Sequence, residues 1–413
     1  MHLYRNYASA ASDLGRRQQL GKKLLSTMLV GFFMLGCFCP SQLGLIGLGS
    51  LSRPLGFAGY ICGIVFILFN VRSFKLDSPV VATLLFISLG LVLTAMKGDF
   101  TNLYLQTLLE MALLCLATQV GLKDDDELYI TVAFYVLGFL VVVNALFILL
   151  SLQTHPSGYF QSNDPDAMAG VWLLGHKNQL RNWIIPCISL SHLLDGVRGK
   201  DTTVRTLFVT LVGILSAYYS DSATTFAVLL VFSAVLLLSL MSNRGKSTLL
   251  DPVVGSVFTA VAFFACVFLR NVPFLGSVIE NALGRDASFT GRTSIWDDAI
   301  SWISEEPLGT GYFTASHSRL MNNAGWIVNH AHDAYLDTML KYGLLGSIIF
   351  IVLVVLAIKS LLSANDWRVR LSLSACLISF LFCGIFGELF NSGYFLVLYL
   401  CCYCGMIETR ANE

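Results

Sequence analysis

The chain of 413 residues has little charge and no excess of either sign. Lysine and arginine number 26, aspartate and glutamate number 26, and charged residues make up 13% of the chain, roughly half of the ~25% typical of soluble domains. A chain with no net positive charge lacks the field that gathers nucleic acid, so we predict no nucleic-acid partner. Hydrophobic residues make up 55%, which is more apolar surface than so few charges could cover in water. These proportions predict a polytopic membrane protein.

The sequence also lacks the cysteine and histidine spacings of a metal site. Its 11 cysteines lie mostly in apolar runs, where cysteine behaves as a small hydrophobic residue. His330 and His332 lie two residues apart, but no cysteine and no Glu-x-x-His pattern near them could complete a zinc site. We therefore predict no bound metal and no other cofactor.

Long apolar runs are what the sequence has in abundance. A membrane-spanning helix needs about 20 mostly apolar residues, and these runs predict an all-α membrane protein with about 12 transmembrane helices. Residues 1–413 would form a single integral membrane domain. The predicted spans are 24–39, 55–70, 79–96, 102–120, 128–150, 180–195, 206–219, 223–241, 253–270, 335–358, 371–387 and 392–407.

Lysines and arginines in the loops predict the orientation, because cytoplasmic loops carry an excess of them. With the N-terminus in the cytoplasm, 17 of the 26 basic residues lie on the cytoplasmic side. Both termini are then cytoplasmic, and residues 151–179 and 271–334 form outward loops. The second of these, inserted between the ninth and tenth spans, is large enough to contain short helices.

A short amphipathic helix is predicted inside the large loop. Ser294 followed by Asp297 resembles a capping box, and apolar residues recur on one helical face until Pro307 ends the pattern. Arg292 would lie just before the first turn, where backbone N–H groups and the helix dipole favour an anion. Its planar guanidinium could hold a diphosphate. The alternative is a surface arginine that pairs with Asp297 or Glu306.

The large loop ends in Asn329-His-Ala-His332, at the mouth of the tenth predicted span. A histidine whose pKa lies near the ordinary ~6.5 suits general-base work. Such a residue could take the proton from an attacking sugar hydroxyl. The alternative is a histidine that hydrogen-bonds a loop carbonyl.

A second polar cluster lies at the start of the sixth predicted span. Lys177 and Arg181 could bind phosphate there, while Asn178 and Trp183 could bind a sugar, with His176 beside them. The alternative is an interfacial anchor made of tryptophan and basic residues.

Four motifs follow one another along the chain, namely Gly175-His-Lys-Asn178, Gly291-Arg292 with Trp296, Pro307-Leu-Gly-Thr-Gly311, and Asn329-His-Ala-His332 with Gly343-Leu-Leu-Gly346. In this order they resemble the superfamily of O-antigen ligases and O-antigen or exopolysaccharide polymerases of bacterial inner membranes. In that family a histidine followed after ten residues by glycine is a hallmark, and His332 with Gly343 fits this spacing. The first motif is more similar to the exopolysaccharide polymerase branch.

The resemblance implies an inverting, metal-independent glycosyl transfer at the periplasmic face of the inner membrane. The donor would be an oligosaccharide on undecaprenyl diphosphate, embedded in membrane lipid, and the lipid diphosphate would leave. His332 would be the base and Arg292 would steady the diphosphate, because stabilising charge on a leaving group is a large catalytic contribution. A chain-length regulator and an export complex are further partners that the resemblance suggests. The residues expected to bind substrate are His176, Lys177, Asn178, Arg181, Arg285 and His330.

One departure from the family pattern favours a polymerase over a ligase. Ligases of this family carry an arginine, followed four places later by leucine, at the start of a mid-chain span. The corresponding residues 220–225 contain no arginine, and we hypothesise that Lys177 or Arg181 has taken over its role. A polymerase would join lipid-linked repeat units, whereas a ligase, the alternative, would move the glycan onto lipid A-core.

A lipid-linked glycan flippase or another transporter is the alternative from a different class, because twelve spans with both termini inside is also a transporter layout. A flippase would concentrate its charges inside the spans, where Glu110 and Glu388 are the candidates. The acidic run 124–127 is predicted to be a solvated turn on the cytoplasmic side.

Overall fold

The structure of this chain is a computed structural model. It describes residues 2–40, 42–159, 170–200, 203–222, 225–226, 228–230, 232–233, 251–269 and 292–407, with side chains from residue 18 onward. Most of the described residues are helical, as predicted. Two antiparallel pairs of two-residue strands qualify the expected all-α class, namely β1 (Val171–Trp172) with β2 (Gly175–His176) and β3 (Leu320–Met321) with β4 (Ile327–Val328).

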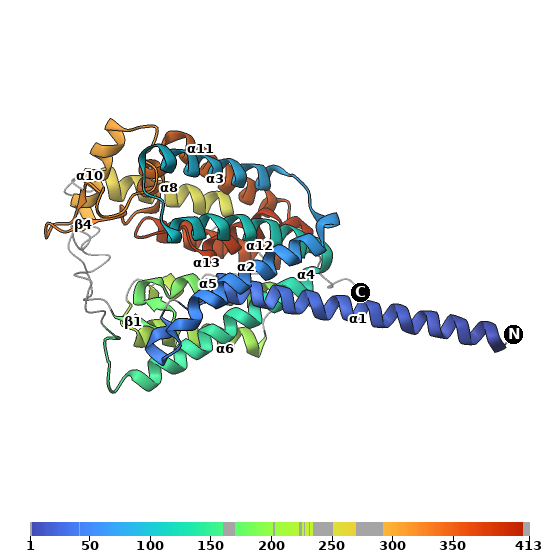
Figure 1. The fold of residues 1–413 in the computed structure, drawn as a ribbon. Helices are drawn as coiled ribbons and strands as arrows, with labels where there is room; N and C mark the ends of the chain where they lie inside the picture. The colour runs from blue at the N-terminus through green and yellow to red at the C-terminus, as the bar shows by residue number, and fades with distance from the viewer. Residues whose placement is uncertain are drawn as a thin grey trace.

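The helices form one bundle (Figure 1). The α-helices are α1 (His2–Cys37), α2 (Ser52–Phe69), α3 (Ser78–Lys97), α4 (Asn102–Ser151), α5 (Arg181–Val197), α6 (Val204–Tyr219), α8 (Pro252–Phe268), α10 (Arg292–Glu305), α11 (Ala334–Leu362), α12 (Trp367–Gly384) and α13 (Ser392–Cys402). Short 3-10 helices are η1 (Leu43–Ile46), η2 (Gly49–Leu51), η3 (Val71–Ser73), η4 (Lys177–Gln179) and η7 (Cys404–Met406).

Side-chain caps fix where several of these helices begin. Asp251 accepts hydrogen bonds from the backbone N–H groups of Val253 and Val254, and Pro252 follows it at the first helical position. Both features are favoured at helix N-termini, because the cap satisfies N–H groups that have no partner inside the helix. The same capping role is played by Asp77, Thr101, Asp333, Asp366 and Asn391.

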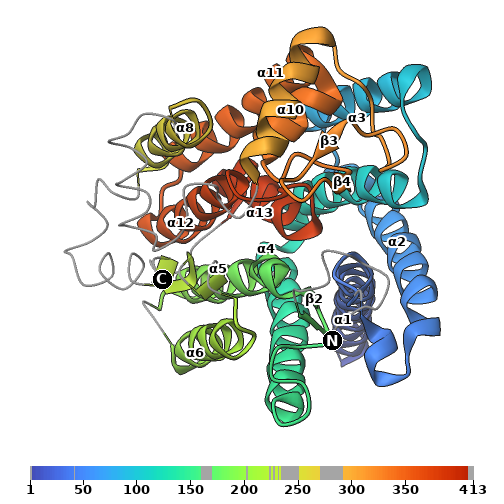
Figure 2. The same cartoon turned by 90° about the vertical axis from the view of Figure 1, so that its left-hand side faces the viewer.

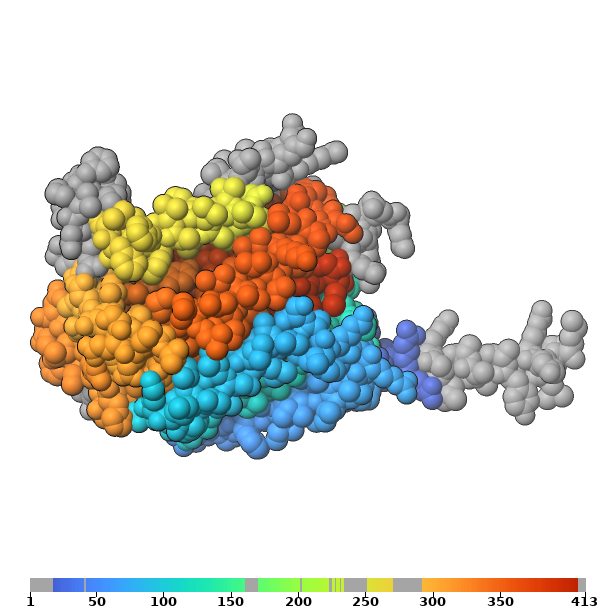
Figure 3. Space-filling view, turned by 90° about the horizontal axis from the view of Figure 1, so that it is seen from above, coloured from blue at the N-terminus to red at the C-terminus, as the bar shows by residue number. Residues whose placement is uncertain are grey.

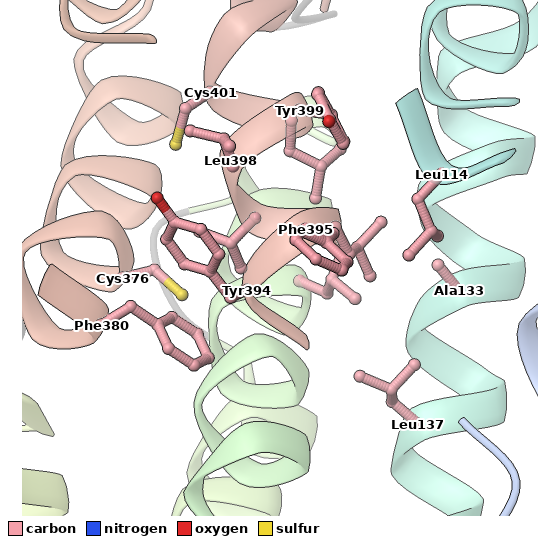
Figure 4. Close-up of a cluster of buried hydrophobic side chains, with 14 of the residues drawn as sticks. Leu114, Ala133, Leu137, Cys376, Phe380, Tyr394, Phe395, Leu398, Tyr399 and Cys401 are labelled. Atoms are coloured by element: carbon pink, nitrogen blue, oxygen red, sulfur yellow. The ribbon is translucent and has the colours of Figure 1, made fainter. Parts of the chain in front are cut away.

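Helix α13 lies at the centre of the bundle. All of its residues are buried, and Tyr394 and Phe395 project between α12 and α4 (Figure 4). A helix that is apolar on every side suits either a protein core or a membrane span, and here α4, α5, α11 and α12 all contact it. Residues 385–391, which lead into α13, are therefore attached at one end to a buried helix.

Six helices of the described part are long and apolar enough to cross a membrane. One of them, α4, is 50 residues long and leaves helical geometry at Asp125, so it covers both predicted spans 102–120 and 128–150. Helices α6, α8 and α13 are apolar but shorter. The predicted span 223–241 lies mostly outside the described residues. The structure agrees with a polytopic helical membrane protein, but the predicted count of twelve spans is not confirmed.

The outer surface of the bundle is rich in large apolar side chains, as a lipid-facing surface requires. Helices α8, α11 and α3 lie side by side on one face (Figure 3). Exposed apolar residues on these and neighbouring helices include Phe57, Leu85, Phe258 and Ile351.

The segments with the predicted polar motifs gather at one end of the bundle. Helix α10 and strand β4 lie at the same end as strand β1, whereas α1 begins beyond the opposite end (Figure 1). Figure 2 looks onto the motif-bearing end, where β2 and β4 both face the viewer. The assignment of this end to the periplasm stays a prediction.

The acidic run 124–127 lies at the bend of α4, where a turn was predicted, and its residues are exposed or half-exposed. Three of its carboxylates nevertheless pair with basic residues. Lys22 of α1 lies 2.7 Å from Asp124, and Lys23 lies 3.2 Å from Asp125. Arg198, after α5, lies 2.9 Å from Glu127. The acidic run thus connects α1 and the end of α5 to the bend in α4. The sequence did not predict these ion pairs, because the partners are far apart along the chain.

Helix α11 is interrupted at Gly343, which has φ 66° and ψ −169°. The break frees the carbonyl oxygens of Leu340 and Lys341, which accept hydrogen bonds from the backbone N–H groups of Thr310 and Gly311 at 2.9 and 3.0 Å. A Cβ atom on Gly343 would lie 2.3 Å from the carbonyl carbon of Leu308. The Pro307–Gly311 motif therefore needs a glycine in α11, and this accounts physically for the glycine of the His-x10-Gly spacing.

We predict that Gly343→Ala destabilises the protein by at least about 1–3 kcal/mol, because its backbone conformation is almost confined to glycine. The measurement is the thermal unfolding midpoint of the protein in detergent. Gly405→Ala is the matched control, because its added Cβ would meet no atom within 4 Å. Equal midpoints for the two variants would show that the break in α11 carries no such constraint.

Candidate active site

Arg292 is the first residue of α10 and contacts a segment far away in the sequence. Its Nη1 donates a hydrogen bond to the carbonyl oxygen of Phe386 at 3.0 Å. The predicted capping box is wrong, because α10 begins before Ser294, whose hydroxyl donates instead to the carbonyl oxygen of Met321. Glu306, one predicted partner of Arg292, pairs with Lys97 at 2.9 Å.

The predicted apolar face of α10 is buried at Ile295, Trp296 and Ala299, and half-buried at Ile300 and Ile303. Trp302 is buried as well, although the sequence pattern did not include it. This face packs with Phe313 of the following loop. The packing sets the direction of α10 and so places Arg292 at its start.

The backbone around the histidine pair is held by two carboxylates. Asp333 accepts from the N–H groups of Tyr335 and Leu336, and Asp337 accepts from the N–H of Ala331 at 3.1 Å. Between these anchors His332 has φ 52°, which is uncommon for a residue with a side chain. Strain of this kind often marks functional sites.

The two histidines contact each other and an acidic residue. His330 Nε2 lies 3.1 Å from His332 Nδ1, and His330 Nδ1 lies 2.8 Å from the Asn329 amide oxygen and 3.6 Å from Glu388 Oε1. Both of these oxygens only accept, so Nδ1 of His330 carries the proton. In neutral His330, Nε2 then accepts from His332 Nδ1, which leaves Nε2 of His332 without a proton. That is the tautomer that a general base requires.

The environment of His332 lowers its pKa to about 2, chiefly because burial disfavours the charged ring, with His330 and then Arg292 adding positive charge nearby. The pKa of His332 therefore lies well below the ~6.5 that suits a general base. Burial raises the pKa of Asp333 well above its ordinary value, and its Oδ2 has no hydrogen-bond partner among the described residues.

The second cluster follows the β1–β2 hairpin. Lys177 Nζ lies 3.0 Å from Asp221, and the Asn178 amide oxygen accepts from the hydroxyl of Ser222 at 3.1 Å. His176 Nδ1 accepts from the N–H of Asn178 at 3.2 Å. These residues thus connect the hairpin to residues 220–222, where the ligase pattern would have an arginine.

Arg181 differs from these residues, because it is buried with 5% of its surface exposed. Within the described part of the chain its guanidinium has no hydrogen-bond or ion-pair partner. A Cβ atom on Gly387 would lie 2.7 Å from Nη2 of Arg181. A buried cation without a partner is costly, so this position is suited to receive an anion.

Residues 385–391, which connect α12 to α13, bring the two clusters together. Phe386 receives the hydrogen bond from Arg292, Gly387 lies against Arg181, and Glu388 faces His330. Sequence reasoning noticed Glu388 but did not place it with the histidines. One feature could have predicted this contact: Glu388 lies at the outer end of a predicted span, on the same side as the histidines.

Arg285, expected to help bind substrate, lies outside the described residues. Among the residues that are described, no group of three or more histidine, cysteine, aspartate or glutamate side chains is arranged to hold a metal ion.

We predict that lowering the pH from 7 to 5 costs about 2 kcal/mol of stability through His332. The unfolded chain takes up a proton on this residue below its ordinary pKa, whereas burial keeps the folded ring neutral until about pH 2. Stability from this residue is therefore complete above pH ~6.5 and falls as the pH falls.

The measurement is the difference in unfolding free energy between pH 7 and pH 5, which should shrink by that amount in His332→Gln. The matched control His317→Gln, at an exposed histidine, should keep the wild-type difference. An unchanged difference in His332→Gln would contradict the burial of a neutral ring.

Comparisons with known proteins agree with this geometry. Residues 208–351 match the O-antigen ligase family. Over 180 residues, 37% of the chain, the sequence is 29% identical to the exopolysaccharide production protein ExoQ of Rhizobium meliloti (strain 1021). The matched region spans 39% of that relative's length. No solved structure matches the chain.

The matched region of the O-antigen ligase family contains Arg292, the histidine pair and Gly343. The similarity to an exopolysaccharide production protein agrees with the branch that Gly175–Asn178 favoured. The chain is thus a helical membrane protein that is similar, over residues 208–351, to the O-antigen ligase family and, over 37% of its length, to an exopolysaccharide production protein.

Proposed function

We propose that this protein is a polysaccharide polymerase at the periplasmic face of the inner membrane. It transfers a glycan from undecaprenyl diphosphate to a hydroxyl group of another lipid-linked repeat unit. The observation that carries this proposal is the meeting of Arg181 and Arg292 at the adjacent residues Gly387 and Phe386, next to His332.

The two arginines supply a site for a diphosphate. Arginine binds phosphate oxygens in a bidentate way through its planar fork. Arg181 is buried and has no partner among the described residues, so an arriving diphosphate would satisfy it. The same two cations would then stabilise the negative charge that grows on the diphosphate as it leaves.

His332 supplies the base. Its Nε2 takes the proton of the acceptor hydroxyl as that oxygen attacks the anomeric carbon of the donor sugar. The bond between this carbon and the diphosphate oxygen breaks, and attack from the opposite face inverts the configuration. His330 and Glu388 stabilise the imidazolium that forms, because His332 Nδ1–H donates to His330 and His330 Nδ1 faces Glu388.

Binding of the donor prepares this base. Burial, then the charge of His330 and then that of Arg292 lower the pKa of His332. A diphosphate bound at Arg292 would offset the last of these three contributions and so raise the pKa of His332 in part.

Two observations favour a polymerase over the ligase, and a third favours it over the transporter. The relative is named for exopolysaccharide production, and Asp221 with Lys177 occupies the region where a ligase has its arginine. For a transporter, charges should follow a path through the spans, whereas Arg181, Arg292 and the histidines lie at one end of the bundle. A chain-length regulator and an export complex stay proposed partners.

The test uses purified protein in nanodiscs, lipid-diphosphate-linked repeat units and no added metal, with products resolved as a ladder on a gel. We predict that His332→Ala and Arg292→Ala lower the rate of ladder formation by at least about 100-fold, the usual scale for general-base and oxyanion groups. His317→Ala and Arg319→Ala, at exposed positions, are the matched controls.

A ladder that persists in His332→Ala would remove His332 from its role. Transfer to lipid A-core without a ladder would identify a ligase, and movement of the lipid-linked glycan across the membrane without transfer would identify a flippase.

A further prediction separates Lys177 from Arg181. Because Lys177 is paired with Asp221 and Arg181 has no partner in the described part of the chain, Arg181→Ala should lower polymer output by at least tenfold more than Lys177→Ala. Arg181→Lys should restore only part of the activity, since lysine lacks the planar fork. If alanine at both positions left the output unchanged, neither residue would have the anion-binding role.

A further inference from the structure

A cavity of about 200 Å³ lies beside the proposed active site. It contains no residue of the four family motifs, but Trp183, which the sequence offered as a sugar-binding residue, is part of its wall. Its walls come from the end of α1, the first turns of α4 and α5, and residues 390–393 at the start of α13. Among its lining residues are Gln106, Glu110, Asn182, Trp183 and Asn391. The mixture of amide, carboxylate and aromatic side chains is unusual in a bundle whose helices are mostly apolar.

Glu110 is held at the cavity wall by three donors. Its Oε1 accepts from the hydroxyl of Tyr60 and from the amide of Gln106 at 2.9 Å, and its Oε2 accepts from the hydroxyl of Ser392 at 2.6 Å. Three helices, α2, α4 and α13, therefore fix the position of one carboxylate. A polar side chain inside a membrane bundle usually has a function, because placing it there is costly.

Asn182 presents an acceptor that the protein does not use. Its Oδ1 is buried and has no hydrogen-bond partner among the described residues. Buried polar atoms are almost always satisfied in native structures, so this oxygen is suited to a hydroxyl or N–H group of a ligand. Trp183, the next residue, also lines the cavity, and its indole N–H is directed to the carbonyl oxygen of Phe38 at 3.4 Å.

The charges of the lining indicate a neutral ligand. No lysine, arginine or histidine is among the described residues around the cavity, and Glu110 is its acidic group. A phosphate would be repelled there, whereas sugar hydroxyl groups donate well to carboxylate and amide oxygens. The volume is below the ~300–1,000 Å³ of sites for larger ligands, which limits the occupant to about one sugar ring.

The cavity is joined to the proposed active site through two short stretches of chain. Asn182 follows Arg181 directly, and Ser392 comes four residues after Glu388. The groups that would bind a diphosphate and those that would bind a neutral sugar are therefore positioned by the same segments.

We propose that this cavity binds one neutral sugar ring of the glycan substrate, with Asn182 and Glu110 accepting hydroxyl hydrogen bonds and Trp183 packing against the ring. The source of the sugar, a lipid-linked glycan, rests on the proposed function. The cavity would then position the repeat unit beside the bond that reacts. It would also contribute to the specificity for the sugar.

Binding can be tested without any transfer reaction. The full chain in nanodiscs is mixed with the methyl glycosides of glucose, galactose and N-acetylglucosamine, and contact is measured by saturation-transfer NMR. We expect at least one glycoside to bind the wild type, and its signal to fall at least fivefold in Asn182→Ala and in Trp183→Leu. The matched controls Asn323→Ala and Trp326→Leu change the same residue types at exposed positions of the β3–β4 turn and should keep the signal.

Thermal unfolding midpoints show that each variant is folded before it is compared. Binding that persists in both cavity variants, or its absence from the wild type for all three glycosides, would overturn the proposal. Binding that depends on Asn182 in a protein that forms no polymer would support the sugar site while the proposed function fails.

Discussion

The hydrogen bond from Arg292 to the carbonyl oxygen of Phe386 is the contact on which the candidate site depends. It ties the start of α10 to the connection between α12 and α13, where Arg181 and His330 also meet the chain. The connection can serve as this common support because α13, which follows it, is buried on all sides. Three segments that are far apart in the sequence are thereby fixed around three consecutive residues.

A second constraint sets the distance between the histidine and the membrane-spanning part of α11. Gly343 interrupts the helix, and the Pro307–Gly311 turn docks on the carbonyl groups that the break exposes. Asp337, one turn into α11, reaches back to the N–H of Ala331. The spacing between His332 and Gly343 therefore belongs to one structural unit. In this unit the first turns of α11 connect a histidine of positive φ to the break in the helix.

The sequence predicted features that depend on local patterns, and it failed where distant partners decide. Apolar runs predicted most of the helices, and the periodicity after Ser294 predicted α10, although its cap was wrong because Ser294 bonds to Met321 instead. The low pKa of His332 and the pairing of Glu388 with His330 arise from tertiary burial, which no spacing along the chain reveals. The family resemblance pointed to His332, Arg292 and Arg181, but it did not indicate that Arg181 is buried and lies against Gly387.

The central claim is that Arg181 and Arg292 together form the binding site for a lipid diphosphate, and native mass spectrometry tests it most directly. Purified protein would be mixed with undecaprenyl diphosphate, and the retained lipid compared between the wild type and the Arg181→Ala/Arg292→Ala double variant. A paired control would replace Arg319 and Arg198, which are partly exposed and have acidic partners of their own. The account predicts that the wild type and the control retain the lipid and that the double variant loses it. Equal retention in all three proteins would contradict the account.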